Sequence, residues 1–442
     1  MKSAQTYDVL ILGAGYAGLM AALRLADRRE VGTIGLVNES EFFVERVRLQ
    51  ESLNAPVSPR LPPLARWLRQ TNIQFIRGKV VHLDADARKV EIAVDDDRRT
   101  LEFGRCIYAL GSRTDIEMKG VATHAYRLDP DDGPRSASAL RRRLLELTSW
   151  GGKVAVVGGG NTAVEAAGEI RISYPSLDVT ILAKDRVGDF GKGEKVERYT
   201  RRQLASIGVR ILDDQPVLEV RRDGLLTGSG ALIDADVCVW AAGMRCAAIA
   251  REAGLTVDDT DRIVVDPCLR SISHPCILAI GDAARPIAPT GAVYRPSAFA
   301  ALISAAYASA SIRNEVQGKA NRPFSFSAYG QGIAIGDSGV GFITFPDDGR
   351  GRLLITGRAA LAIRDLFVRM LVWLLRLERR RLGGALFWIG RARVSWHDAN
   401  VACRSLARES SLEVRTAPFR DTTIVSEMRC PAKVRVACRA PP

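Results

Sequence analysis

The chain has 442 residues, of which 47% are hydrophobic and 26% are charged, and its formal net charge is +13. This length exceeds one ordinary core, so we expect two or three domains, and the composition excludes disordered and collagen-like chains. The first residues lead directly into an apolar stretch, and no uncharged apolar run reaches 18 residues, so the sequence predicts neither a signal peptide nor a membrane-spanning helix. The eight cysteines show no C-x-x-C spacing, so we expect reduced thiols, a cytoplasmic protein and no metal site.

The positive charge is concentrated at one end of the chain. Residues 351–390 carry eight arginines and two acidic residues, and residues 391–442 carry ten basic and five acidic residues. This last part therefore holds +11 of the +13, and the rest of the chain is nearly neutral. A basic end of this kind indicates a local anionic partner and not nucleic-acid binding by the whole chain.

The first predicted element is an apolar strand at 9–12, which ends at Gly13. Small and apolar residues then recur at helical spacing over 17–25, so the stretch predicts a strand, a tight turn and a helix. Gly13 allows the sharp turn, Gly15 lets the backbone approach a pyrophosphate, and Gly18 lets the helix pack close to the strand. The turn residues expected at the cofactor are Gly13, Gly15, Tyr16, Ala17 and Gly18.

The next strand is expected at 32–37, and Asn38 and Glu39 follow it. In a dinucleotide fold a carboxylate at this point accepts from the ribose hydroxyls. Glu39 is the better candidate because it is ionised, and Asn38 would give a weaker bond; the alternative is that both are solvated loop residues. Short strands over 73–103 follow, and a further strand ends at Gly111, which suits backbone contact with a bound cofactor.

The opening pattern recurs after a turn cluster at 129–134. An apolar run at 153–157 leads into a glycine turn and a helix, with Ala163 where the third glycine would stand. Two such motifs, about 145 residues apart, predict two nucleotides in one chain. The expected contacts here are Gly158, Gly160, Asn161 and Thr162, with Gly243 at the end of the strand that closes the inserted domain.

The strand at 178–182 bears on the choice of nicotinamide nucleotide. It is followed by Ala183, where a carboxylate would meet a ribose 2′-hydroxyl. Lys184 and Arg186 could instead neutralise a 2′-phosphate, which favours NADPH over NADH. The alternative is that both side chains are exposed and idle.

A third dinucleotide feature is the apolar strand at 276–280, which delivers Gly281 and Asp282. A carboxylate in this position can accept from the polyol chain of a flavin, with the N-terminus of the following helix near the flavin ring. A helix rich in small residues is expected at 297–312 and would pack closely under the cofactor.

The C-terminal part predicts strands at 324–336 and a basic amphipathic helix at 358–376. One narrow face of this helix is expected to hold Arg358, Asp365, Arg369 and Arg376, while Leu361, Leu366, Met370, Leu371, Trp373 and Leu374 lie elsewhere. Residues 358–381 could lie on an anionic membrane surface, or the helix could pack on the protein as an ordinary surface helix. Residues 391–442 show no periodicity and predict a flexible tail.

These elements predict an α/β fold with two Rossmann-like dinucleotide-binding domains, the second inserted in the first, and a small C-terminal α+β region. The expected boundaries are 1–120 and 265–318 for an FAD-binding domain, 121–264 for an NAD(P)H-binding domain, 319–390 for the C-terminal region and 391–442 for the tail.

This pattern resembles the two-dinucleotide flavoproteins of the glutathione reductase superfamily, and within it the type II NADH dehydrogenases and their apoptosis-inducing-factor-like relatives. The resemblance covers about residues 7–390 and rests on the two glycine motifs, Val239–Gly243, Ala279–Ala283 and Arg295-Pro-Ser-Ala. It implies FAD in the first domain, NAD(P)H in the inserted one and a C-terminal region that meets the membrane. It also implies that Glu165 lies near the nicotinamide and positions its carboxamide.

The sequence departs from these relatives in two places. Their quinone-side helix reads A-Q-x-A-x-Q, and this chain keeps Ala298, a candidate cofactor contact, and Ala301 but has Phe299 and Ile303 at the glutamine positions. The disulfide-reductase branch needs a C-x-x-x-x-C pair, and residues 42–55 contain no cysteine, so dithiol chemistry is not expected.

The predicted function is that of an FAD-dependent NAD(P)H dehydrogenase. Hydride passes from the nicotinamide to FAD, and electrons then pass to a quinone or another small acceptor. The alternatives are a redox-sensing or partner-binding flavoprotein with little turnover, and a ferredoxin-type reductase. The expected location is cytoplasmic, with peripheral attachment to the inner face of the cell membrane as one possibility.

Overall fold

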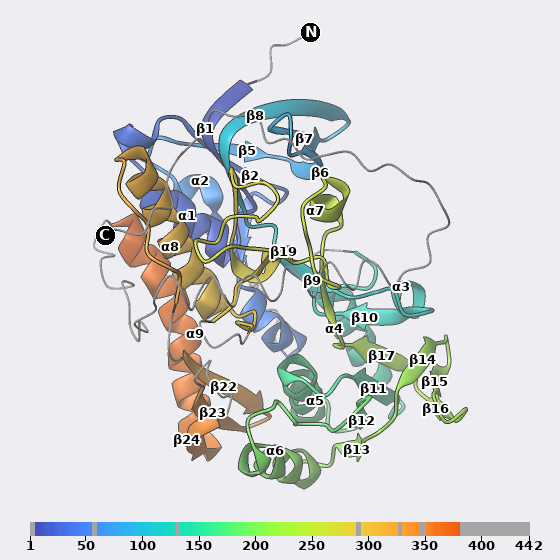
Figure 1. Cartoon of the computed structure of the whole chain (residues 1–442). Coiled ribbons are helices and arrows are strands. Elements are labelled where there is room, and N and C mark those ends of the chain that lie inside the picture. Colours follow the sequence, from blue (N-terminus) through green and yellow to red (C-terminus); the bar gives the residue numbers. More distant parts are fainter. Residues whose placement is uncertain are drawn as a thin grey trace, which may run out of the picture.

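The computed structural model describes residues 5–54, 60–129, 133–288, 293–325, 329–344 and 351–380, and the predicted tail at 391–442 lies outside them. Figure 1 shows an upper lobe and a lower lobe, with the long helix α9 (Gly357–Arg379) running along one side of both. None of the helices in the described ranges has the length and apolar character needed to cross a bilayer.

The upper lobe is built on a seven-stranded sheet. Its strands are β1 (Gln5–Leu12), β2 (Ile34–Asn38), β5 (Ile73–Arg77), β6 (Lys79–Asp84), β7 (Lys89–Val94), β8 (Asp97–Tyr108) and β20 (Ile277–Ala279). The order is β5-β2-β1-β8-β7-β6, with β20 beside β8. The pairs among β5, β2, β1, β8 and β20 are parallel, and β6 and β7 form an antiparallel extension. The apolar run of β1 is buried on both faces, as is typical of a parallel strand covered on both sides.

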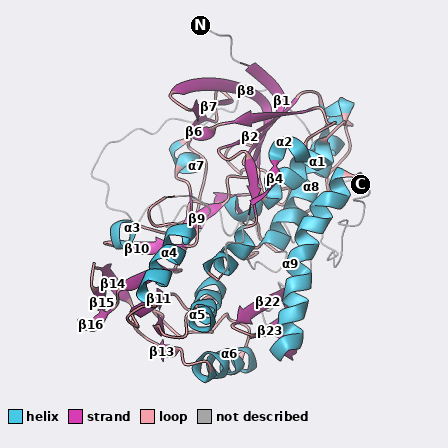
Figure 2. Cartoon of the chain, turned by 180° about the vertical axis from the view of Figure 1, so that it is seen from behind, coloured by secondary structure: helices cyan, strands magenta, loops and turns pink. Residues whose placement is uncertain are grey.

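Helices cover this sheet. The longer ones are α1 (Tyr16–Leu25) and α8 (Ala298–Val316), and the shorter ones are η1 (Arg29–Val31), η2 (Arg46–Leu53), α2 (Leu64–Trp67), α7 (Ile249–Glu252) and η3 (Gly281–Ala283). Every residue of α1 is buried. Figures 1 and 2 show why: α8 and α9 both lie against it. The small side chains of α8 permit this close packing, and Ser309 of α8 donates a hydrogen bond to the backbone oxygen of Ala21.

The lower lobe has a five-stranded parallel sheet in the order β10-β17-β11-β12-β13. Its strands are β10 (Ala125–Arg127), β11 (Lys153–Val157), β12 (Asp178–Leu182), β13 (Arg210–Leu212) and β17 (Val237–Trp240), and its helices are α3 (Val121–His124), α4 (Ala137–Leu147), α5 (Asn161–Ser173) and α6 (Glu194–Ser206). An antiparallel sheet of β14 (Val217–Val220), β15 (Gly224–Thr227) and β16 (Leu232–Asp234) lies beside it. The predicted α/β fold with two such parallel sheets is confirmed.

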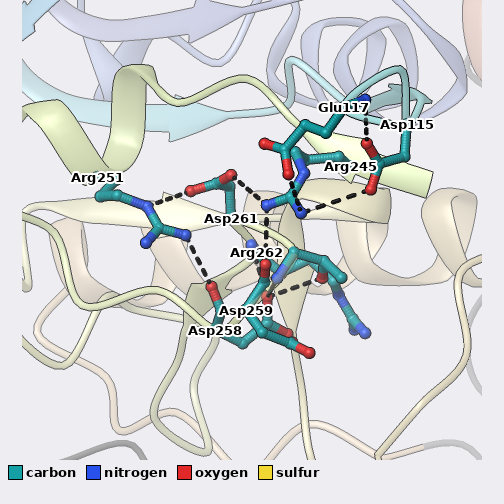
Figure 3. A network of polar contacts seen from close by, with 9 residues as sticks. Asp115, Glu117, Arg245, Arg251, Asp258, Asp259, Asp261 and Arg262 are labelled. Atoms are coloured by element: carbon teal, nitrogen blue, oxygen red, sulfur yellow. Dashed lines mark hydrogen bonds and ion pairs between the residues drawn. The ribbon is translucent and has the colours of Figure 1, made fainter. Parts of the chain in front are cut away.

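The chain crosses between the lobes at an antiparallel ribbon of β9 (Ser112–Thr114) and β18 (Met244–Cys246). Figure 3 shows that Arg245 of this ribbon lies among acidic side chains from two segments. Its guanidinium lies 3.4 Å from Asp115, 3.1 Å from Glu117 and 3.2 Å from Asp261, and it also donates to the Asp259 backbone oxygen. These contacts fix the ribbon to the loop after α7 in the upper lobe. Two further pairs, β3 (Phe42–Val44) with β4 (Arg60–Pro63) and β19 (Ile263–Val264) with β21 (Ala284–Arg285), complete the upper lobe.

The C-terminal region is the antiparallel sheet β22 (Tyr329–Ile335), β23 (Ser338–Thr344) and β24 (Gly351–Thr356), followed by α9. Its strands belong to the core of the lower lobe, where Gly168 of α5 meets the β22–β23 turn so closely that a Cβ would lie 2.7 Å from the Gly336 nitrogen. The last turns of α9 belong to the core of the upper lobe, where Glu378 forms an ion pair of 3.2 Å with Arg24 of α1. The C-terminal region therefore bridges the two lobes.

The helix predicted at 358–376 is confirmed, and Arg358, Arg369 and Arg376 of its predicted polar face are exposed. Leu366 is 69% exposed and Trp373 is 53% exposed, and they share the outward face with Arg358, Arg369 and Arg376. The buried face includes Arg364, which is 6% exposed. Arg364 is buried because acidic groups of other elements, Glu51 and Glu165, lie beside it.

Candidate cofactor and nucleotide sites

Parallel pairing brings the predicted residues of the upper lobe to one edge of its sheet. Leu12 pairs with both Val37 and Tyr108, and Tyr108 pairs with Ala279, so β1, β2, β8 and β20 end side by side. The segments that follow these strands carry Gly13, Asn38, Glu39, Gly111, Gly281 and Asp282. Ligands of open α/β sheets bind at this carboxyl edge.

The first glycine turn is closed too tightly for any other residue. Gly13 has φ +96°, a conformation that L side chains rarely adopt, and a Cβ there would overlap the backbone oxygen of Ala109. A Cβ on Gly18 would overlap the backbone oxygen of Gly13. Helix α1 is therefore packed directly on the turn that precedes it.

The middle of the same turn is open. Gly15 caps α1 with ordinary extended angles, and no atom lies within 4 Å of the position that a Cβ would take. Gly111 has the same open surroundings. The first N–H groups of α1 have no partner within the helix, so this space combines free donors with the positive end of the helix dipole. The cradle fits the pyrophosphate of a dinucleotide such as FAD.

Tyr16 and Ala17 follow Gly15 at the start of α1. The ring of Tyr16 is buried and packs edge-on against Phe43, with ring centroids 5.1 Å apart. Ala17 faces the Gly-Asp segment, since a Cβ on Gly281 would lie 3.1 Å from the Ala17 Cβ. These contacts place Phe43, which comes just after β2, and Gly281 against the first turn of α1.

The two candidates at the end of β2 have different partners. The Asn38 side chain accepts from the Ala14 nitrogen at 2.8 Å and donates to the Ser40 oxygen at 2.7 Å, so it braces the first glycine turn. Glu39 is more exposed and lies 3.3 Å from Arg113 and 3.8 Å from Lys79. Of the two, Glu39 keeps its carboxylate at the surface, where a ribose could reach it.

Asp282 is held beside the crossover ribbon. Ser112 donates to its Oδ2 at 2.8 Å, while Oδ1 has no partner among the described residues. The preceding Gly281 has φ +64° and donates its N–H to the hydroxyl of Ser304 on α8 at 3.1 Å. A carboxylate with one free oxygen, set next to Gly111 and α1, fits a polyol hydroxyl of a flavin.

Cys246 lies next to this carboxylate but is not reactive. Its thiol donates to the backbone oxygen of Asp282 at 3.5 Å, and burial raises its pKa to about 12. It is therefore a thiol and not a thiolate at neutral pH.

In the lower lobe, Val157 pairs with both Leu182 and Trp240, so the second glycine turn lies beside the ends of β12 and β17. Gly158 has φ +135°, and a Cβ there would lie 2.7 Å from the Ala241 oxygen. Gly160 caps α5 and has no atom within 4 Å of a built Cβ, and Asn161 and Thr162 are exposed on the first turn of α5. Gly243, with φ +75°, begins the crossing back to the upper lobe.

The loop after β12 lies against this second turn, because Gly188 donates to the Gly159 oxygen at 3.1 Å. The two predicted cations, Lys184 and Arg186, differ in whether they already have an acidic partner. Arg186 forms an ion pair of 2.6 Å with Glu197 of α6. Lys184 is exposed and has no ion pair with the described residues. Of these two cations, Lys184 is therefore the one open to an anionic ligand.

Glu165 lies on α5 but its carboxylate turns toward the C-terminal region. Oε1 accepts from the Ala334 nitrogen of β22 at 3.0 Å and lies 3.4 Å from Arg364, and Oε2 accepts from Gln50 of η2 at 2.8 Å. Burial is the main cause that raises its pKa, while Arg364 and the Ala334 N–H act in the opposite direction. The residue is therefore a buried carboxylate at the junction of three segments.

The start of α8 has no polar side chain at the two glutamine positions of the related helices. Ser297 caps the helix by accepting from the Ala300 nitrogen, and Ala298 is its first residue. Phe299 and Ile303 are each 8% exposed, and Phe299 packs on Phe367 of α9 with centroids 5.6 Å apart. This part of the site is an apolar wall.

Sequence reasoning missed several residues that hold the site together. Ser112 follows Gly111 directly, so its place next to Asp282 could have been found from that strand end. Ser304 lies two turns into α8, and Gln50 and Arg364 reach Glu165 from other segments. No local pattern marks these three residues.

The comparisons with known proteins agree with this geometry. Residues 7–308 match the family model described as pyridine nucleotide-disulphide oxidoreductase. The chain is 28% identical to the NADH dehydrogenase-like protein Rv1812c of Mycobacterium tuberculosis over 298 residues, which cover 62% of this chain and 72% of that protein. It is 24% identical to the type II NADH:quinone oxidoreductase of Haemophilus influenzae, covering 66% and 77% of the two chains. Identity to ferroptosis suppressor protein 1 of Xenopus tropicalis is 26%, covering 82% and 94%.

Solved structures show the same fold. The sulfide:quinone oxidoreductase of Aquifex aeolicus superimposes with a TM-score of 0.72 at 17% identity, covering 85% of this chain and 92% of that one. NDH2 of Plasmodium falciparum in complex with NADH gives a TM-score of 0.71 at 16% identity, covering 88% and 100%. The match over two glycine turns and their connecting ribbon identifies the chain as a member of the pyridine nucleotide-disulphide oxidoreductase family, whose members bind FAD and use NAD(P)H.

Proposed function

We propose that this chain is an FAD-dependent NAD(P)H dehydrogenase that passes hydride from the nicotinamide to FAD and then electrons to a quinone or another small acceptor. The observation that carries the proposal is the pair of glycine turns, one in each lobe, each with an open space at its middle glycine. Asp282, with its free oxygen beside the first turn, gives that turn the partner that a flavin needs.

The residues proposed to hold FAD are Gly13, Gly15, Tyr16, Ala17, Gly18, Asn38, Glu39, Gly111, Gly281, Asp282 and Ala298. Bound FAD supplies the ring that accepts hydride and releases electrons. The N-terminus of α1 binds the pyrophosphate. The carboxylate of Asp282 accepts a hydrogen bond from a polyol hydroxyl, and that of Glu39 accepts one from a ribose hydroxyl. The apolar start of α8 excludes water on its side of the cofactor.

The residues proposed to hold the nicotinamide nucleotide are Gly158, Gly160, Asn161, Thr162, Lys184 and Gly243. Lys184 meets a 2′-phosphate, since Arg186 is already paired with Glu197. The Glu165 carboxylate accepts from the carboxamide and so sets the face of the nicotinamide ring. Reaction rate then depends on how well this orientation is kept.

The second electron acceptor is proposed to be small. A quinone is supported by the printed name of the Haemophilus influenzae relative. Phe299 and Ile303 offer no hydrogen bond to a quinone carbonyl, and this favours a second candidate, an electron-transfer protein of the ferredoxin kind that needs no such bond. An acceptor screen with soluble quinones and ferredoxin separates the two.

Helix α9 is proposed to rest on an anionic membrane surface. Its outward face combines exposed apolar side chains, Leu366 and Trp373, with Arg358, Arg369 and Arg376. Such a mixture suits a helix that lies at the interface of lipid head groups and acyl chains. Co-sedimentation with anionic vesicles, but not with neutral ones, is the expected result, and it should be lost in Trp373→Ala with Leu366→Ala.

The function itself is tested by anaerobic mixing of the purified holoprotein with NADPH or NADH in a stopped-flow instrument. We expect the flavin absorbance to bleach with at least one nucleotide, and an added quinone to restore it over many turnovers. A yellow, folded protein that neither nucleotide bleaches overturns the proposal. If the flavin absorbance returns only once for each molecule of an added partner protein, without further turnovers, the result supports the sensor alternative.

Lys184→Ala is the sharper test of the co-substrate. We expect about a tenfold loss in kcat/KM with NADPH and little change with NADH, because one charge-assisted contact with the 2′-phosphate disappears. The matched control is Lys195→Ala, a lysine on the first turn of the neighbouring helix α6. Equal losses with both nucleotides would contradict this role for Lys184.

A further inference from the structure

We propose that Arg364 is a positioning residue for the nicotinamide: it holds the carboxylate of Glu165 ionised and in place, so that the C-terminal region completes the nucleotide site. The inference rests on the proposed function, because it assigns Glu165 to the nicotinamide carboxamide. It goes further in giving α9 a part in the reaction of the lower lobe, besides any contact with a surface.

Arg364 reaches Glu165 from the buried face of α9. Its Nε lies 3.4 Å from Oε1 of Glu165, and its Nη1 lies 2.6 Å from Oε1 of Glu51 and 3.1 Å from Oδ1 of Asp365. Gly332 of β22 makes room for it, since a Cβ there would lie 2.6 Å from the Arg364 Cβ. A buried guanidinium with this many acidic neighbours is fixed in position.

Two of the three groups that hold the Glu165 carboxylate come from the C-terminal region. These are Arg364 and the Ala334 N–H of β22, and the third is the Gln50 amide of η2. A carboxylate offers about four acceptor positions, so one further N–H, such as that of a carboxamide, can still be accepted. Accepting it as an ionised group makes the bond about twice as strong as a neutral one.

The charged groups around Glu165 shift its pKa in opposite directions. Arg364 favours its ionised form, whereas burial and the carboxylate of Glu51 oppose it. Glu51 is itself paired with Arg48 at 2.7 Å, Asp365 lies behind Arg364, and Glu169 on the same helix bonds to Ser173. Without Arg364, a carboxylate with so little contact with water would hold its proton to a higher pH.

A purely structural role for Arg364 makes a different prediction. If it only pinned α9 to the lower lobe, its loss would lower stability without changing the protonation of Glu165. Two variants that change the charge next to Glu165 in opposite directions separate these roles, because only the positioning role predicts opposite shifts in the pKa of Glu165. Arg364→Gln removes the favourable cation, and Glu51→Gln removes the opposing anion while Arg364 stays.

The experiment follows the holoprotein by infrared titration, in which the C=O band of the protonated Glu165 is identified by its loss in Glu165→Gln. We expect Arg364→Gln to raise the pKa of Glu165 by about one unit or more, Glu51→Gln to lower it, and Arg364→Lys to restore most of the wild-type value. The acid limb of the rate of flavin reduction should move in the same directions, with about a tenfold loss for Arg364→Gln at pH values below the wild-type pKa.

A binding measurement adds a readout that does not depend on turnover. Arg364→Gln should weaken binding of the oxidised dinucleotide several-fold but leave binding of ADP-ribose unchanged, because ADP-ribose has no carboxamide. An unmoved Glu165 band in both Arg364→Gln and Glu51→Gln overturns the inference, as does equal weakening of both ligands. If Arg364→Gln does not fold, the direction of the Glu51→Gln shift still decides. A wild-type flavin that no nicotinamide nucleotide reduces rejects the proposed function instead, and the infrared result stands apart from it.

Discussion

The two glycine turns have the same design and differ in how tightly they close. In the upper lobe a single methyl group on Gly18 would overlap the backbone of Gly13. In the lower lobe Ala163 stands at the equivalent place and is buried, and a Cβ on Gly158 would lie 3.2 Å from its methyl group. Helix α5 therefore stands off its turn by about the width of a methyl group, and helix α1 does not.

This difference teaches that helix packing, and not nucleotide binding, determines whether the third position of the motif must be glycine. The middle glycines, Gly15 and Gly160, are alike in both turns and face open space. The third position follows how deeply each helix is covered: α1 is buried on all sides, whereas α5 has exposed residues on its first turn. Substitutions at equivalent positions should therefore have unequal effects in the two lobes.

The largest effect is expected for Gly18→Ala. The new methyl group would meet backbone atoms that cannot move without separating α1 from β1, so we expect a loss of about 3 kcal/mol or more in the free energy of unfolding. Chemical denaturation of the apoprotein measures it. Ala14→Gly, in the same turn but without added volume, is the control. A Gly18→Ala variant as stable as the wild type would show that the helix can shift, contrary to the contrast drawn here.

The next effect concerns cofactors and not folding. Gly15 and Gly160 have φ of −70° and −85°, so valine at either place strains no backbone. We expect Gly15→Val to give a folded but colourless protein, since its side chain fills the space for the FAD pyrophosphate. Gly160→Val should stay yellow and lose reduction by NAD(P)H. Flavin absorbance and circular dichroism of the pair measure this; two yellow variants would contradict the assignment of the upper lobe.

A smaller effect is expected for Asp282→Asn, which keeps the shape of the side chain and removes its charge. A hydrogen bond to a charged group contributes about 1.5–3 kcal/mol, so FAD affinity should fall by roughly ten- to hundredfold. Fluorescence titration of the apoprotein with FAD measures the change. Asp259→Asn, in the loop after α7, controls for the loss of one negative charge, and an equal fall there would point to a general field effect.

The smallest effect is expected for Ala163→Gly in the lower lobe. Glycine in the first turn of α5 lowers helix propensity and removes a buried methyl group, so the free energy of unfolding should fall by about 1 kcal/mol. Nucleotide affinity should stay the same, because this position faces the turn and not the open space. A large loss of affinity would mean that the methyl group shapes the nucleotide site.

Much of this architecture could be predicted because its signals are local. Each apolar run that ends in glycine became a buried parallel strand, and Leu12, Tyr108 and Ala279 end at one edge as expected for such a sheet. The helix predicted at 297–312 from its small residues is α8, which extends to Val316. The candidate residues of the first turn follow from the same runs.

The rest depends on contacts between segments that are distant in the sequence. Arg364 is nearly 200 residues away from Glu165, and only the fold brings them together. The burial of Arg364 on α9 has the same cause, because hydropathy cannot indicate that Glu51 and Glu165 lie next to an arginine. The bond between Ser304 and Gly281 likewise depends on where α8 crosses the sheet.

The burial of α1 has a consequence for how the protein is made. This helix leaves the ribosome before the segments that cover its apolar surface, which are α8 and, through Glu378, the end of α9. About 350 residues must be added before that last cover exists, which takes roughly 20–70 s at typical translation rates. The nascent chain therefore holds α1 without its complete cover until residue 378 has been added.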